Sequence, residues 1–141
     1  MSEPEHTKDT VRVVRIDAAE FGWQCPLEQY TAVQWRARVW AVLGTAIEQA
    51  QQAVLDLLSE GGGSVLFRVG GAKTDAADCV GVSGLHGLAR SIAKEYGRKN
   101  IRCNVIIGYS NEVEVLVETN GAITGELLVS TNAWGDGHGP R

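Results

Sequence analysis

Cysteine, basic charge and long apolar runs are all scarce in this sequence. Only Cys25, Cys79 and Cys103 are cysteines, and they are odd in number, far apart and never in a CxxC pair. We therefore expect reduced thiols and neither a disulfide nor a zinc site. No apolar run approaches the ~20 residues that span a bilayer, and residues 1–10 are polar and acidic, unlike a signal peptide. The sequence thus predicts a cytoplasmic protein.

The charge balance argues against two kinds of partner. The 13 Lys and Arg are outnumbered by 17 Asp and Glu, which gives a net charge of -4. Nucleic-acid binders rely on basic side chains to neutralise phosphates, and membrane-surface binders also favour basic faces. We therefore expect neither nucleic acid nor membrane as a partner. The length of 141 residues, 44% of them apolar, fits one domain with its own core.

The chain divides into one structured region and two tails. Residues 1–10 and 136–141 are polar or glycine-rich and show no periodicity. Such ends are expected to be poorly ordered unless something holds them. Residues 11–135 carry all the periodic segments, so we expect a single domain there.

The apolar spacing predicts two long helices. Apolar residues recur every three or four positions over residues 27–58, a segment that contains Gly44 but no proline. The glycine cluster 61–63 ends this helix, because glycine takes the left-handed C-cap conformation without strain. A second helix is predicted over residues 79–96, with Gly97 as its stop.

Short β-branched segments between these helices predict strands. The expected strands are residues 11–16, 64–69, 101–107 and 127–130. Residues 112–119 are ambiguous, because their alternation favours a strand whereas their place between two strands favours a short helix; we favour the helix. Strands separated by helices predict an α/β fold of three layers, with a parallel sheet of about four strands.

Four segments resemble, in order, parts of the short-chain dehydrogenase/reductase family. PLEQYTAVQWRARVWAVLGTAIEQAQQAVLDLL resembles a long helix of that family, and GGGSVLFRVG resembles its central strand. GVSGLHGLARSIAKEYGRKNIRCNVI resembles the next long helix and strand, and NGAITGELLVSTNAWG resembles the closing strand. The resemblance covers residues 11–135 and implies a truncated, Rossmann-like fold.

The cofactor half of the family has no counterpart in this chain. That half consists of three strands and a glycine-rich turn that places pyrophosphate on a helix N-terminus. The glycine cluster 61–63 instead ends a helix, where the free carbonyl groups would repel a phosphate. The resemblance therefore implies no cofactor in this chain, and NAD(P) in a partner subunit.

The catalytic tetrad of the family is also missing, position by position. Its asparagine falls on Ala41, its serine on Gly70, its tyrosine on about Asp78 and its lysine on Val82. The family's tyrosine needs a neighbouring lysine to lower its pKa, whereas an Asp with an ordinary pKa near 4 stays ionised. We therefore expect no catalytic residue, and no oxidoreductase activity of this chain alone.

The resemblance further implies a subunit interface built from the two long helices. In the family these helices pack against the same pair in a second subunit as a four-helix bundle. Gly84 and Gly87 would allow a facing helix to approach closely. The expected partner is a full-length NAD(P)-dependent member of the family, or a second copy of this chain. The expected interface residues are Trp40, Leu43, Ile47, Leu85, Leu88, Ile92 and Trp134.

Two other functions stay open on the sequence. One is a repurposed, cofactor-free isomerase, cyclase or lyase with a cleft near Arg68, Lys73, Asp78 and Cys79. A simpler role for Asp78 is the N-cap of the second helix. The other function is a homodimeric module that binds a small molecule.

The first strand, residues 11–16, is expected at an open sheet edge. In the family, the strand that these residues match pairs with the first strand, which this chain lacks. Arg12 and Arg15 blunt this edge, or a neighbouring chain covers it.

Overall fold

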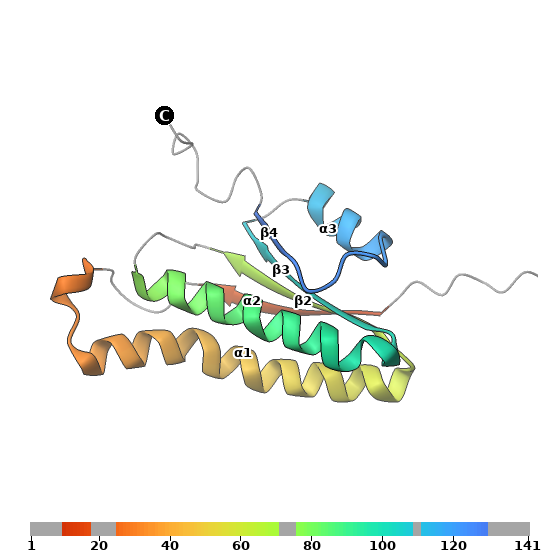
Figure 1. Ribbon diagram of the computed structural model, residues 1–141, viewed down its shortest axis with the longest axis horizontal. Coiled ribbons are helices and arrows are strands. Elements are labelled where there is room, and N and C mark those ends of the chain that lie inside the picture. The colour runs from red at the N-terminus through yellow and green to blue at the C-terminus, as the bar shows by residue number, and fades with distance from the viewer. Residues whose placement is uncertain (1–9, 18–24, 71–75, 109–110, 130–141) are drawn as a thin grey trace, which may run out of the picture.

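A parallel sheet of four strands forms the centre of the described part of the chain (Figure 1). The computed structural model describes residues 10–17, 25–70, 76–108 and 111–129. In chain order the elements are β1 (Val11–Asp17), the 3-10 turn η2 (Leu27–Gln29), α1 (Ala32–Glu60), β2 (Gly63–Gly70), α2 (Ala76–Tyr96), the 3-10 turn η3 (Gly97–Lys99), β3 (Ile101–Ile107), α3 (Asn111–Thr119) and β4 (Leu127–Val129). The strands follow the order β1-β2-β3-β4, and each neighbouring pair is parallel. The predicted α/β fold is confirmed.

The helices cover the two faces of the sheet unequally. In Figure 1, α1 and α2 run along one face, and the shorter α3 lies on the other. Val65, Phe67 and Val69 of β2 belong to the core under α1 and α2, whereas Leu66 belongs to the core under α3. This alternation follows from the two-residue period of a strand, and it makes the fold three-layered as predicted.

A capping box fixes the start of α1. The Gln34 N–H donates to Thr31 Oγ1 at 3.1 Å, and the Thr31 N–H donates to Gln34 Oε1 at 3.1 Å. The helix therefore begins at Ala32 and not at residue 27, which lies in η2. Its C-cap is Gly61 with φ of 87°, so the predicted role of the glycine cluster in ending the helix is confirmed.

The same glycine cluster forms a tight entry into β2. The Gly62 N–H donates to the Leu57 carbonyl at 2.9 Å. A Cβ on Gly63 would lie 2.4 Å from the Thr10 carbonyl oxygen and 2.6 Å from Leu57 Cδ2. Because no larger residue fits there, the cluster serves backbone geometry at the start of the sheet.

The ambiguous segment between β3 and β4 is helical, as favoured. Val113 and Val117, four residues apart, pack onto the sheet, while Val115 and Leu116 are exposed. Arg102 of β3 holds the end of this helix. Its guanidinium donates to the carbonyls of Val117 at 2.8 Å, Asn120 at 3.0 Å and Glu118 at 3.3 Å.

The start of α2 also differs from the prediction. This helix begins at Ala76, so Asp78 is its third residue and does not occupy the N-cap. Across the described ranges, no helix is both long and apolar enough to cross a bilayer.

Candidate functional site

The pocket predicted near the carboxyl end of β2 does not bring Arg68 and Cys79 together. Arg68 is an even-numbered residue of β2, so it lies on the α3 face beside Leu66, whereas Cys79 is exposed on α2. Lys73 and the side chain of Asp78 lie outside the described residues. Arg68 and Cys79 therefore lie on different sides of the sheet, and the cleft predicted near them with Lys73 and Asp78 stays a prediction.

The structure gives Arg68 a different neighbour. Its guanidinium forms an ion pair with the carboxylate of Glu114 on α3, and the two side chains are 21% and 14% exposed. A pair this enclosed joins the helix to the strand, and breaking it leaves an uncompensated charge.

The positions that the resemblance matched to catalytic residues can be placed on the fold. Gly70 is the last residue of β2, and a Cβ there would meet nothing within 4 Å. Ala41 lies in α1, and Val82 of α2 packs against the core. Among these three, no side chain can donate a proton or polarise a carbonyl.

Few of the other described side chains could act as a nucleophile or as metal ligands. Burial raises the pKa of the Cys103 thiol to about 12, so it is not a nucleophile near neutral pH. Within the described ranges, no three His, Cys, Asp or Glu side chains gather in a way that could hold a metal ion.

The clearest candidate site is an apolar groove of about 550 Å³ along α1 and α2, which we call the α1–α2 surface. Its lining residues are Ile47, Ala50, Gln51, Val54, Leu55 and Leu58 of α1, with Leu88, Ile92, Glu95 and Tyr96 of α2. Glu95 is the one charged residue among them, so this surface suits an apolar partner.

Three of the predicted interface residues meet at the α1–α2 surface. Ile47, Leu88 and Ile92 all line the groove. Trp40 is 66% exposed nearer the start of α1. Its indole lies against Gly44, where a Cβ would be 2.9 Å from the ring. These positions are consistent with the interface prediction, which remains a prediction because the structure holds one chain.

Other parts of the interface prediction change. Leu85 is fully buried in the core under α2, so it cannot reach a second chain and its assignment is wrong. Leu43 is half-buried, and it occupies the space beside Gly84, where a Cβ would lie 2.9 Å from it. Gly84 therefore admits α1 of the same chain, while Gly87 faces open space. Trp134 lies outside the described residues.

Leu55 is the most exposed leucine of the α1–α2 surface, at 61%, and it was not among the residues assigned to the interface. The stripe Ile47, Gln51, Val54, Leu58 has the three- and four-residue spacing of one helix face. This spacing is a signal for the groove in the sequence, although only Ile47 of the four was assigned to the interface. Tyr96 continues the four-residue spacing of Leu88 and Ile92 on α2, so the same signal could have found it.

Comparisons with known structures identify the fold. An oxidoreductase of the short-chain dehydrogenase/reductase family from Burkholderia thailandensis matches with a TM-score of 0.69 at 22% identity, over 87% of this chain and 64% of that one. Acetoin dehydrogenase from Salmonella typhimurium matches with 0.68 at 17% identity, over 84% and 62%. A 3-ketoacyl-ACP reductase from Sinorhizobium meliloti matches with 0.64 at 14% identity, over 84% and 66%.

The fold is therefore an α/β arrangement that resembles part of the Rossmann fold of short-chain dehydrogenases/reductases. The similarity to this family, expected from the sequence, is confirmed at the level of structure. The chain spans less than two thirds of the first structures that it matches. No protein-family profile and no curated protein sequence matches the chain.

Proposed function

We propose that this chain is a non-catalytic subunit that pairs with a full-length NAD(P)-dependent short-chain dehydrogenase/reductase as a structural or regulatory partner. The observation that carries the proposal is the apolar groove along α1 and α2. The residues at positions 41, 70 and 82, which offer no catalytic group, support the non-catalytic part.

The composition of the α1–α2 surface favours a helical protein partner. Leu55 and Leu58 are exposed on one stripe of α1, and Trp40 is exposed nearer the start of that helix. Covering a leucine side chain contributes roughly 1.5–3 kcal/mol, and exposed tryptophans are frequent anchors of protein interfaces. A pair of helices laid along this surface would cover all three residues and complete a four-helix bundle.

In this arrangement the reaction takes place in the partner. The partner supplies the dinucleotide site and the proton-transferring residues. This chain contributes a rigid face of two long helices that holds the partner in one conformation. Its effect on the reaction therefore acts through assembly and not through contact with the cofactor.

Co-expression with a full-length short-chain reductase encoded beside this protein tests the proposal. We expect a tagged chain to co-purify the reductase, and Leu55→Glu to abolish this because it places a carboxylate in the apolar groove. The matched control is Leu116→Glu, since Leu116 is 48% exposed on α3, away from the α1–α2 surface. Equal loss in both variants, or no loss in either, would contradict the proposal.

A further inference from the structure

The outer edge of β1 has no neighbouring strand within the described ranges. The Ser64 N–H of β2 donates to the Thr10 carbonyl at 2.9 Å, which fixes the side to which that residue turns. Because backbone groups alternate along a strand, the N–H and C=O groups of Val11, Val13 and Arg15 point away from β2. The seven residues of β1 include no proline, and of the two arginines expected to blunt this edge, Arg12 is paired with Glu60 of α1.

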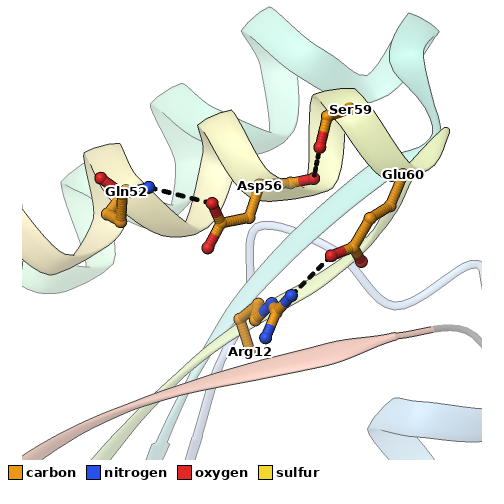
Figure 2. A network of polar contacts seen from close by, with 5 residues as sticks. All are labelled: Arg12, Gln52, Asp56, Ser59 and Glu60. Carbon is orange, nitrogen blue, oxygen red and sulfur yellow. Dashed lines mark hydrogen bonds and ion pairs between the residues drawn. The ribbon is translucent and has the colours of Figure 1, made fainter.

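A second groove, of about 450 Å³, follows this edge between β1 and α1. It is lined by Val11, Arg12, Val13 and Val14 of β1 and by Gln49, Gln52, Ala53 and Asp56 of α1. Figure 2 shows Gln52 and Asp56 on the side of α1 that is turned toward Arg12, with Gln52 Nε2 donating to Asp56 Oδ1 at 2.9 Å. The groove therefore has a strand edge as one wall and a mostly uncharged helix stripe as the other.

The charge of Arg12 is balanced inside the chain. Its Nη2 lies 2.5 Å from Glu60 Oε1 at the end of α1, as Figure 2 shows. The α1 wall of the groove adds the amides of Gln49 and Gln52 and the carboxylate of Asp56, which accepts a hydrogen bond from Gln52. Val13 lies on the α3 side of the strand edge, because side chains alternate along β1 and Val14 belongs to the core under α1.

We propose that two copies of this chain pair edge to edge through β1, antiparallel and about a two-fold axis at Val13. A two-fold interface needs a surface that is complementary to itself. An amide both donates and accepts, so Gln49 and Gln52 can pair with their own counterparts. Val13, which is 40% exposed, meets the same valine of the second copy. The proposal concerns a surface separate from the α1–α2 surface and does not depend on the proposed function.

Pairing centred on Val13 uses the outward backbone groups of Val11, Val13 and Arg15. Val13 then faces its own counterpart, and Val11 faces Arg15 of the second copy. Each of these pairs exchanges both of its N–H to C=O hydrogen bonds, because all the residues involved point outward. The two Arg15 side chains lie about 14 Å apart along the strands, a separation at which their repulsion is weak.

The position of α1 fits the same arrangement. This helix packs on both β1 and β2, so its axis lies slightly inside the sheet edge. Across the two-fold axis the two α1 helices come to about 10 Å from one another, which is the spacing of packed helices. Gln49 and Gln52 of each α1 then lie in the groove of the other copy. The pairing therefore extends both the sheet and the layer of helices that covers it.

Light scattering of the purified chain, combined with gel filtration, tests the pairing. We expect twice the chain mass of 15.1 kDa for the wild type. Val13→Pro should reduce this to the mass of one chain, because proline removes an outward N–H at the axis while no intrachain hydrogen bond is lost. Val13→Thr, which keeps the N–H, should stay dimeric. A monomeric wild type, or a dimer that Val13→Pro leaves unchanged, would overturn the proposal.

Two further measurements separate this dimer from other outcomes. Hydrogen exchange of the wild type should be slow at the amides of Val11, Val13 and Arg15, and fast exchange at all three would overturn the proposal even if Val13→Pro does not fold. Leu55→Glu should leave the dimer intact. A dimer that is lost in Leu55→Glu and kept in Val13→Pro would form through the helices, which would also overturn it.

Discussion

Arg68 of β2 and Glu114 of α3 form an ion pair on the face of the sheet opposite α2. This contact takes the one described cation of the predicted pocket away from Cys79 and commits it to holding α3. Arg68, near the end of β2, therefore has a structural partner, and the last residue of that strand, Gly70, has no side chain.

Glu114→Gln should destabilise the protein by about 2 kcal/mol, because the enclosed guanidinium of Arg68 loses its counter-charge. Urea unfolding measures this change. Glu112→Gln is the matched control, since Glu112 is exposed in the first turn of the same helix, and its effect should stay below about 0.5 kcal/mol. Equal effects of the two substitutions would show that the ion pair does not hold α3.

Gly84 and Gly87 of α2 should respond differently to substitution by alanine. A Cβ at Gly87 meets nothing within 4 Å, so Gly87→Ala should raise the free energy of unfolding by about 0.5–1 kcal/mol through helix propensity. A Cβ at Gly84 would lie 2.9 Å from Leu43, so Gly84→Ala should lose that gain or destabilise. Thermal unfolding of the two variants gives the comparison, and a larger gain at Gly84 would contradict the packing described for α1 and α2.

Cys103 should make the protein less stable in alkali. Burial raises the pKa of this thiol to about 12 in the folded chain, whereas the unfolded value is about 9. Between these values the unfolded chain releases a proton that the folded chain keeps, so stability falls as the pH rises above about 9, by up to about 1.4 kcal/mol per pH unit. Urea unfolding at several alkaline pH values should show a steeper loss for the wild type than for Cys103→Ala. Identical slopes would contradict the burial of the thiol.

NADH and NADPH should not stabilise the chain when it is alone. A ligand that binds the folded state raises the melting temperature, and the helix that precedes β2 ends in carbonyl groups at the glycine cluster. We therefore expect no thermal shift with either dinucleotide, and no carbonyl reduction in the same tube. A full-length short-chain reductase treated in parallel serves as the positive control. A clear shift for this chain would show a dinucleotide site that the account does not contain.

The helices and strands could be predicted from the sequence because the local spacing of apolar residues matches the faces that these elements bury. The three- and four-residue spacing in α1 and the β-branched residues of β2 and β3 match the faces that each element buries. The start of α1 was placed too early because the reciprocal capping bonds of Thr31 and Gln34 decide it. That pair is visible in the sequence as a threonine three positions before a glutamine, which is the pattern of a capping box.

The residues of the candidate site were harder to predict from the sequence, because they depend on which face of a helix or strand contacts which other element of the fold. Leu85 and Leu88 lie three positions apart on α2, yet Leu85 is enclosed by the core and Leu88 reaches the groove. The partnership of Arg68 with Glu114 joins residues 46 positions apart, so no local spacing indicates it. Strand alternation predicts only that Arg68 lies on the face of the sheet opposite to the core residue Phe67, and it does not name the partner.

Native mass spectrometry of the protein purified from its own cells tests the proposed partnership most directly. The account predicts assemblies whose mass includes, besides copies of the 15.1 kDa chain, a second chain of about 25 kDa, the size of a full-length dehydrogenase domain. Masses that are only multiples of 15.1 kDa would contradict it.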